Sequence, residues 1–140
     1  MNLVVDSSVA AKWFFAERNS REAQLLLSPR FSLIAPDFIL SEVANVIWKK
    51  YRRNEISHFH PYIEALDRLT EVIKLHPLAD YVIQAVSLAI QIDHPVYDCI
   101  YLTCAQGHSL PFLTADESLR RKVLAECPSI AVWSIGDLNV

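Results

Sequence analysis

The sequence predicts an α/β fold, a three-layer α/β/α sandwich with a mainly parallel central sheet. Short apolar runs alternate with longer segments whose apolar residues recur at helical spacing. The short runs are mainly apolar, which is typical of strands covered on both faces. The chain has 140 residues, is 52% hydrophobic and contains no linker or repeat, so we expect a single domain over residues 1–140.

Five short runs are candidate strands, and four segments between them have helical patterns. The expected strands are Leu3–Val5, Ser32–Ala35, Val72–Leu75, Pro111–Leu113 and Ala131–Trp133. The expected helices cover 37–52, 56–70, 78–92 and 97–106, the last being apolar nearly all round and therefore central. Three buried helical stripes are expected: Ile39, Val43, Val46 and Ile47; Ile56, Phe59, Ile63, Leu66 and Leu69; and Leu78, Val82, Val86 and Ile90.

Charge and glycine content exclude some classes of function. The net charge is −3 and the isoelectric point is about 5.9, so the surface as a whole does not attract nucleic acid indiscriminately. The basic clusters KKYRR at 49–53 and RRK at 120–122 are interpreted as solvated helix faces. With only two glycines, Gly107 and Gly136, the chain has no glycine-rich phosphate loop.

The cysteines and the N-terminus favour a cytoplasmic protein. Three cysteines, Cys99, Cys104 and Cys127, form no CxxC motif, so we expect buried, reduced thiols. Asp6 interrupts the first apolar run, which argues against a signal peptide. No apolar run is long enough for a membrane span, so no membrane association is expected.

Four acidic residues lie near strand ends or in early helical turns. Asp6 follows the first strand, Asp116 follows PFLT, Asp98 opens the apolar helix, and Glu42 lies in the helix after strand 32–35. Ligands of parallel sheets bind beyond the carboxyl ends of the strands. The topology can therefore bring these four carboxylates to one edge of the sheet.

Each acid also has a purely structural interpretation. Aspartate is a preferred helix N-cap. TADE at 114–117 matches a capping box with Thr114 as the cap, which leaves Asp116 free, and a serine after Asp6 can cap the first helix. Capping remains open for Asp98. Glu42 shares a polar stripe with Asn45 and Lys49, which could be an ordinary solvated face.

Carboxylates that cluster without partners repel one another, and a hard divalent cation best relieves this repulsion. Mg²⁺ prefers oxygen ligands and commonly uses one or two carboxylates together with substrate phosphates. Such a site can activate water and neutralise charge at a phosphodiester. No cysteine and histidine set has zinc spacing, and no serine lies in a G-x-S-x-G motif.

The chain resembles the PIN-domain ribonucleases, and among them the VapC toxins of toxin–antitoxin pairs. The matching stretches are LVVDSSVAAKWF, SEVANVIWK, YDCIYLTCA and FLTADESLRRKV, in the family's order and over nearly the whole chain. The resemblance implies a PIN-like fold and a metal-dependent endoribonuclease acting on RNA. It also implies a homodimer and a small VapB-like antitoxin partner.

The resemblance also implies roles for individual residues. Asp6, Glu42, Asp98 and Asp116 are the expected catalytic acids, with Ser8 and Thr114 as polar support. Asp6, Asp98 and Asp116 are expected to hold Mg²⁺ or Mn²⁺, directly or through water, and Glu42 either binds the metal or orients the attacking water. Two further residues are weighed separately: Lys12 as an RNA contact, and Glu117 as the one acid available for a second metal ion.

Two alternatives remain open from the sequence. A catalytically silent PIN-like module could keep the acidic cleft only to bind a partner. A phosphatase or receiver-type α/β domain also has acids at strand ends. However, Asp6 is followed by two serines and not by the Asp-x-Asp of such phosphatases, and the acidic pair of receivers is missing.

Overall fold

Five parallel strands form the sheet of the computed structural model, which describes residues 1–138. The strand order is β3-β2-β1-β4-β5. The strands are β1 (Asn2–Val5), β2 (Ser32–Pro36), β3 (Ile73–His76), β4 (Phe112–Thr114) and β5 (Val132–Ser134). Each lies within one residue of the range predicted from its apolar run. In the central pairings, Val4 lies opposite Ile34 on one side and Phe112 on the other.

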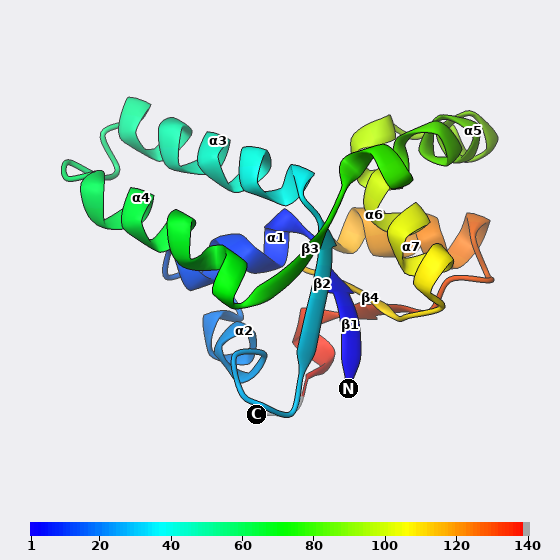
Figure 1. The fold of residues 1–140 in the computed structure, drawn as a ribbon, viewed down its shortest axis with the longest axis horizontal. Coiled ribbons are helices and arrows are strands. Elements are labelled where there is room, and N and C mark those ends of the chain that lie inside the picture. The colour runs from blue at the N-terminus through cyan, green and yellow to red at the C-terminus, as the bar shows by residue number, and fades with distance from the viewer. Residues whose placement is uncertain (139–140) are drawn as a thin grey trace.

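Helices lie on both sides of the sheet, which confirms the α/β/α prediction (Figure 1). They are α1 (Ser7–Ala10), α2 (Ser20–Leu25), α3 (Phe38–Arg52), α4 (His60–Asp67), α5 (Val82–Ile92), α6 (Val96–His108) and α7 (Glu117–Glu126). The helices α3 and α4 pack side by side and project as an arm, while α5, α6 and α7 lie on the other side of the sheet. None of the helices within residues 1–138 is both long and apolar enough to cross a membrane.

The helix α6 is the central helix that its composition predicts. Every residue from Cys99 to Ala105 is buried, and the helix packs against β1, β2 and β4. All three cysteines are free and buried, as expected. Burial raises the pKa of Cys99 and of Cys104 to about 11, so both are neutral thiols at physiological pH.

One of the predicted apolar stripes is buried, and two are partly wrong. Ile39, Val43 and Ile47 of α3 are buried as expected. In α5, however, Val86 and Ile90 are exposed, because the helix turns its smaller Ala85 towards the core. In the 56–70 segment, Phe59 and Ile63 are also exposed. The four-residue spacing identifies these helices correctly but does not distinguish a core face from an uncovered apolar face.

The strand order defines where a ligand can bind. The chain runs outward from β1 to β2 and β3, and then returns to place β4 on the other side of β1. In open parallel sheets, ligands bind at this reversal, outside the carboxyl ends of the strands. The crevice after β1 and β4 is therefore the expected site. A receiver-type domain has the different order 2-1-3-4-5, so the receiver alternative is wrong.

Candidate active site

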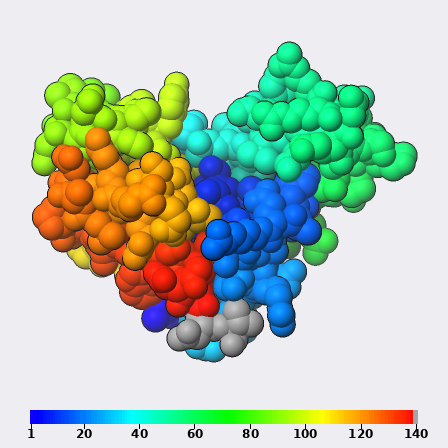
Figure 2. Space-filling view, turned by 180° about the vertical axis from the view of Figure 1, so that it is seen from behind, coloured from blue at the N-terminus to red at the C-terminus, as the bar shows by residue number. Residues whose placement is uncertain are grey.

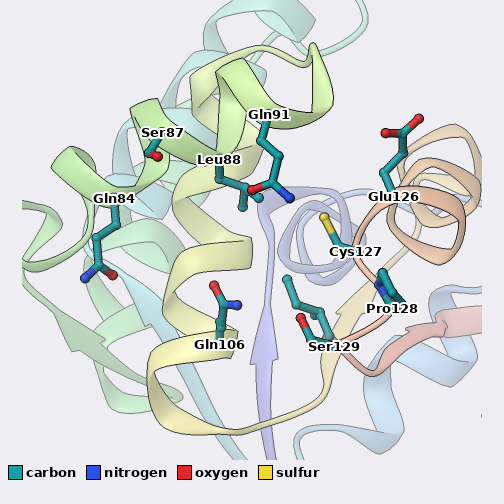
Figure 3. A pocket seen from close by; sticks show the side chains of 10 residues that line it. Gln84, Ser87, Leu88, Gln91, Gln106, Glu126, Cys127, Pro128 and Ser129 are labelled. Carbon is teal, nitrogen blue, oxygen red and sulfur yellow. The ribbon is translucent and has the colours of Figure 1, made fainter.

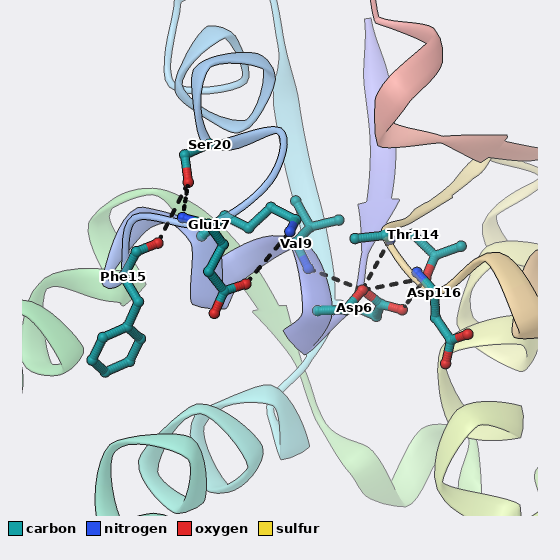
Figure 4. Close-up of polar contacts among 10 residues, drawn as sticks. Asp6, Val9, Phe15, Glu17, Ser20, Thr114 and Asp116 are labelled. Carbon is teal, nitrogen blue, oxygen red and sulfur yellow. Dashed lines mark hydrogen bonds and ion pairs between the residues drawn. The ribbon is translucent and has the colours of Figure 1, made fainter. Parts of the chain in front are cut away.

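Asp6 lies at the reversal point, immediately after β1, and is 4% exposed. Its carboxylate accepts hydrogen bonds from the hydroxyls of Ser8, at 2.5 Å, and Thr114, at 2.6 Å (Figure 4). The backbone N–H of Val9 donates a third bond at 3.3 Å, so Asp6 itself caps α1. Burial raises the pKa of Asp6 to about 6, although the three hydrogen bonds lower it in part. The negative charge of Asp98 adds to the increase.

Glu42 lies in the second turn of α3, where it is half-buried. The buried hydroxyl of Tyr101 donates a hydrogen bond of 2.5 Å to Glu42 Oε1. Burial raises the pKa of Glu42, hydrogen bonds from Tyr101 and Ser7 lower it, and the charge of Asp98 raises it. Glu42 therefore does not lie on an ordinary solvated face. It is half-buried, and Tyr101 holds its carboxylate in place.

Asp98 is the third residue of α6, and Pro95 occupies the cap position of that helix. Its carboxylate accepts no backbone hydrogen bond among the described residues, so Asp98 does not act as a helix cap. Instead, Asp98 Oδ2 lies 2.7 Å from His94 Nε2. Because its charge raises the pKa of both Asp6 and Glu42, Asp98 lies within electrostatic reach of both residues.

Asp116 is linked to this group through its backbone. Its N–H donates to Thr114 Oγ1 at 3.1 Å, and the same hydroxyl donates to Asp6. Its exposed carboxylate extends away from Asp6 (Figure 4) and caps α7 by accepting from the N–H of Leu119 at 3.0 Å. The predicted capping box is therefore wrong: Asp116 is the cap, and Thr114 is free to bind Asp6.

Ser8 and Thr114 join the two strand ends into one network. Their hydroxyls lie 3.3 Å apart, and Ser8 Oγ accepts from the N–H of Ala115 at 3.0 Å. Ser8 lies in the first turn of α1 and Thr114 at the end of β4, so both sides of the reversal point hold the same carboxylate. The network orients Asp6 without any positive charge.

Two further residues of interest are engaged elsewhere. Lys12 pairs with Glu17 at 3.5 Å, and its side chain is only 9% exposed. Glu117 accepts a hydrogen bond from the hydroxyl of Ser134 and pairs with Arg120 at 3.5 Å. The RNA contact expected of Lys12 stays a prediction, and the second-metal role of Glu117 has a competing structural role.

The acids approach one another without forming a closed ligand cage. Within residues 1–138, no three His, Cys, Asp or Glu side chains are close enough to hold a metal ion between them. The arrangement is an open set of oxygen ligands in which Asp6 and Glu42 carry raised pKa values. Such a set suits an ion that keeps several water ligands.

Sequence reasoning missed His94 and Tyr101 as parts of this site. His94 lies just before α6, four residues before Asp98, and Tyr101 lies in α6, three residues after Asp98. The sequence pattern presents Tyr101 only as one residue of an apolar helix, and His94 belongs to no motif. Their polar atoms are the partners of Asp98 and Glu42.

The molecule is hollowed between the arm formed by α3 and α4 and the region that contains α5 (Figure 2). Atoms of the N-terminal segment, in dark blue, are visible in this hollow. A separate pocket of about 410 Å³ lies between α5, α6 and the turn after α7 (Figure 3). Three glutamines and the 126–130 turn line this pocket, and none of the four acids does. This pocket is therefore distinct from the acidic site.

Known proteins resemble the chain in sequence and in fold. Ribonuclease VapC3 of Pyrobaculum aerophilum is 32% identical over 127 residues, which cover 87% of this chain and 95% of the relative. VapC20 of Mycobacterium tuberculosis, a toxin that cleaves the sarcin–ricin loop, superposes with a TM-score of 0.65 at 18% identity, over 85% of this chain and 93% of the other. A toxin–antitoxin complex from Klebsiella pneumoniae has a chain that superposes with a TM-score of 0.61 at 16% identity, over 95% and 97%. Residues 3–123 match the model of the PIN domain, and the chain belongs to this family.

Proposed function

We propose that this protein is a metal-dependent endoribonuclease and the toxin component of a VapBC-type pair. The observation that carries the proposal is the position of Asp6 at the reversal point of the sheet, with Asp98 close enough for its charge to raise the pKa of both Asp6 and Glu42. The relative named Ribonuclease VapC3, aligned over most of both chains, supports RNA as the substrate. The toxin–antitoxin complexes of similar fold support the biological role.

The donor set fits Mg²⁺ or Mn²⁺. All the candidate ligands are carboxylate oxygens, and Asp6 is held in place by neutral donors that leave its charge uncompensated. Asp6, Asp98 and Asp116 would hold the ion, directly or through water. When bound, such an ion would lower the pKa of a water molecule and neutralise charge at the scissile phosphate.

The protein's own residues would orient the reaction. Ser8 and Thr114 fix Asp6, His94 contacts Asp98, and Tyr101 directs the carboxylate of Glu42. Glu42 would either bind the ion or accept a proton from the attacking water. Its raised pKa makes the Glu42 carboxylate a better proton acceptor than an ordinary glutamate.

The arm offers an apolar groove for the antitoxin. Ala44, Ile47, Trp48, Tyr51, Phe59, Ile63 and Leu66 line a hollow of about 330 Å³ between α3 and α4. A VapB-like segment would place apolar side chains in this groove and an arginine against the acids, because a guanidinium matches a carboxylate in two hydrogen bonds. Saturating Mg²⁺ should then weaken the binding of that segment.

The exposed face of α5 supports a homodimer. Ile83 is 81% exposed and Ile90 is 78% exposed, and Tyr97 of the next helix is also uncovered. Exposed apolar patches usually mark interfaces, and twofold pairing is the common solution. Light scattering over a dilution series should give a dimer that Ile83→Glu with Ile90→Glu converts to a monomer. A wild-type monomer at high micromolar concentration would exclude the dimer.

The nuclease is tested by incubating the purified protein with a mixture of cellular RNAs and Mn²⁺. We expect internal cleavage that EDTA stops and that a co-expressed antitoxin suppresses. Because no three acids converge within residues 1–138, a silent partner-binding module is the second candidate. Antitoxin binding without any metal-dependent cleavage would select that second candidate.

A further inference from the structure

The outer side of α3 carries a row of polar and basic residues that begins at Glu42. Asn45, Lys49 and Arg53, here named the α3 row, follow Glu42 at intervals of three, four and four residues, and all three are exposed. We propose that the α3 row is the path of the RNA strand beyond the scissile phosphate, with Lys49 and Arg53 contacting its phosphates. This inference rests on the proposed ribonuclease function.

Helix geometry places the α3 row in line with the acids. Residues three, four, seven and eleven positions apart lie on one side of an α-helix, and the rise is about 1.5 Å per residue. Lys49 therefore lies about 10 Å from Glu42 along the axis, and Arg53, at the C-terminal cap, about 16 Å. A strand that leaves the acids along α3 meets both cations in turn.

The cations of the α3 row are available to a ligand. Neither Lys49 nor Arg53 forms an ion pair with a carboxylate within residues 1–138. Their neighbour Lys50 differs: it is half-buried, lies 5.3 Å from the ring of Phe15, and pairs with Glu55 at 3.6 Å. Within the basic cluster at 49–53, Lys50 thus has a structural role, whereas Lys49 and Arg53 have no carboxylate partner among the described residues.

An aromatic side chain borders the α3 row. The guanidinium of Arg52 lies 5.3 Å from the centre of the Trp48 ring, which is itself 52% exposed. Flat cationic and aromatic surfaces of this kind bind unpaired bases by stacking, without sequence preference.

Electrostatics explain why the site needs such a path. The protein has a net charge of −3, and its acids repel a phosphodiester unless a cation lies nearby. Local cations release counterions from the RNA and supply affinity independent of sequence. The α3 row lies where these cations would offset the acidic end of the sheet.

The test compares Lys49→Ala combined with Arg53→Ala against Lys50→Ala, which removes a cation from the same helix but off the row. Fluorescence anisotropy in EDTA measures binding of a labelled single-stranded RNA of about 12 nucleotides, a length within the range that single-strand grooves cover. This readout does not require cleavage. The double variant should bind roughly tenfold more weakly, and the salt dependence of log K should become shallower by about 1.4, for two lost phosphate contacts.

Cleavage provides the second readout. With Mn²⁺, the double variant should have a higher KM for the long RNA, an unchanged kcat, and unchanged cleavage of an RNA of about three nucleotides, too short to span the row. The proposal is overturned if the double variant binds like the wild type, or if Lys50→Ala loses as much affinity. Unchanged RNA affinity together with weaker antitoxin binding would assign the row to the protein partner instead. RNA binding that depends on the α3 row, without any cleavage, would refute the proposed ribonuclease activity and would still support the α3 row as the RNA path.

Discussion

Tyr101 and Tyr81 are two buried tyrosines whose hydroxyls meet very different partners. Tyr101 donates to Glu42 at the acidic end of the sheet, formed by Asp6, Glu42 and Asp98. The hydroxyl of Tyr81 lies 2.8 Å from His108 Nε2, whose ring lies 4.6 Å from that of His76; we name this second group the histidine corner. Burial raises the pKa of both tyrosines far above its ordinary value, so both remain neutral.

The two regions differ in how they handle charge. At the acidic end, the carboxylates of Asp6 and Glu42 are held by hydroxyl groups, which bring no positive charge to them. At the histidine corner, burial and the nearby His108 lower the pKa of His76, which favours its neutral form. We infer that one tyrosine supports a binding site and the other supports packing between helices. The following predictions test this difference, beginning with the largest effect.

Replacing Asp98 should have the largest effect. Asp98→Asn keeps the shape of the side chain but removes one charge, and RNA cleavage should fall by about 100-fold or more. Asp80→Asn, beside the histidine corner, is the matched control and should change the rate by less than about twofold. A fluorogenic RNA assay with Mn²⁺ measures both. Wild-type cleavage by Asp98→Asn would remove this residue from the mechanism.

The raised pKa of Asp6 should make the metal-free protein less stable as the pH rises. Between the unfolded value of 3.8 and the folded value of about 6, only the unfolded carboxyl loses its proton, so the free energy of unfolding falls. The loss is complete above about pH 6 and amounts to roughly 3 kcal/mol.

Asp6→Asn isolates this effect, because the variant has no charge to lose. Urea unfolding at pH 4 and at pH 7 should show the variant gaining stability relative to the wild type as the pH rises. Saturating Mn²⁺ should restore the wild type at pH 7, since the ion binds only the folded state. A difference between the two proteins that does not change with pH would contradict the assignment.

Tyr101→Phe should weaken function through Glu42. Outer hydrogen-bond partners of metal ligands are typically worth about 10- to 100-fold in affinity or activity. We expect losses of that size in Mn²⁺ affinity, measured by calorimetry, and in cleavage. In a Glu42→Gln background, the same change should cost almost nothing more, because the two residues act as a unit. Additive losses would indicate a packing role for Tyr101.

Tyr81→Phe should have the smallest effect, and on stability alone. The change removes the partner of His108, and one buried hydrogen bond contributes about 0.5–1.5 kcal/mol. Urea unfolding should show a loss in this range, with Mn²⁺ affinity and cleavage unchanged. A loss of cleavage equal to that of Tyr101→Phe would remove the contrast between the two regions.

The sequence predicts the fold well where local patterns and buried surfaces coincide. The strands and the buried helix α6 follow from mainly apolar runs, which are most stable in the interior of a folded domain. The face of α5 is predicted incorrectly because Val86 and Ile90 have the periodicity of a core stripe and yet are exposed. Periodicity describes one helix alone, whereas burial depends on what packs against it.

The sequence predicts the acids of the candidate site but not the residues that form hydrogen bonds with them. Asp6 is identifiable because it directly follows a strand and the strand ends meet at one edge of a parallel sheet, and Asp98 because it opens the central helix. The sequence assigns the cap of α7 to Thr114, whereas in the structure Asp116 is the cap. The Thr114 hydroxyl instead donates to the carboxylate of Asp6, 108 positions away in the chain. A contact over that separation leaves no local signal. The bond from Tyr101 to Glu42 is hidden for the same reason.

The central place of β1 in the sheet has a consequence for folding during synthesis. β1 is made first, yet its partner β4 and the hydroxyl of Thr114 are made after four-fifths of the chain. A partly synthesised chain on the ribosome therefore has Asp6 but not the strand that fixes it. Domains generally fold as units during synthesis. The site of the proposed ribonuclease should therefore form only after β4 has been made, so the growing chain should not cleave RNA before that point.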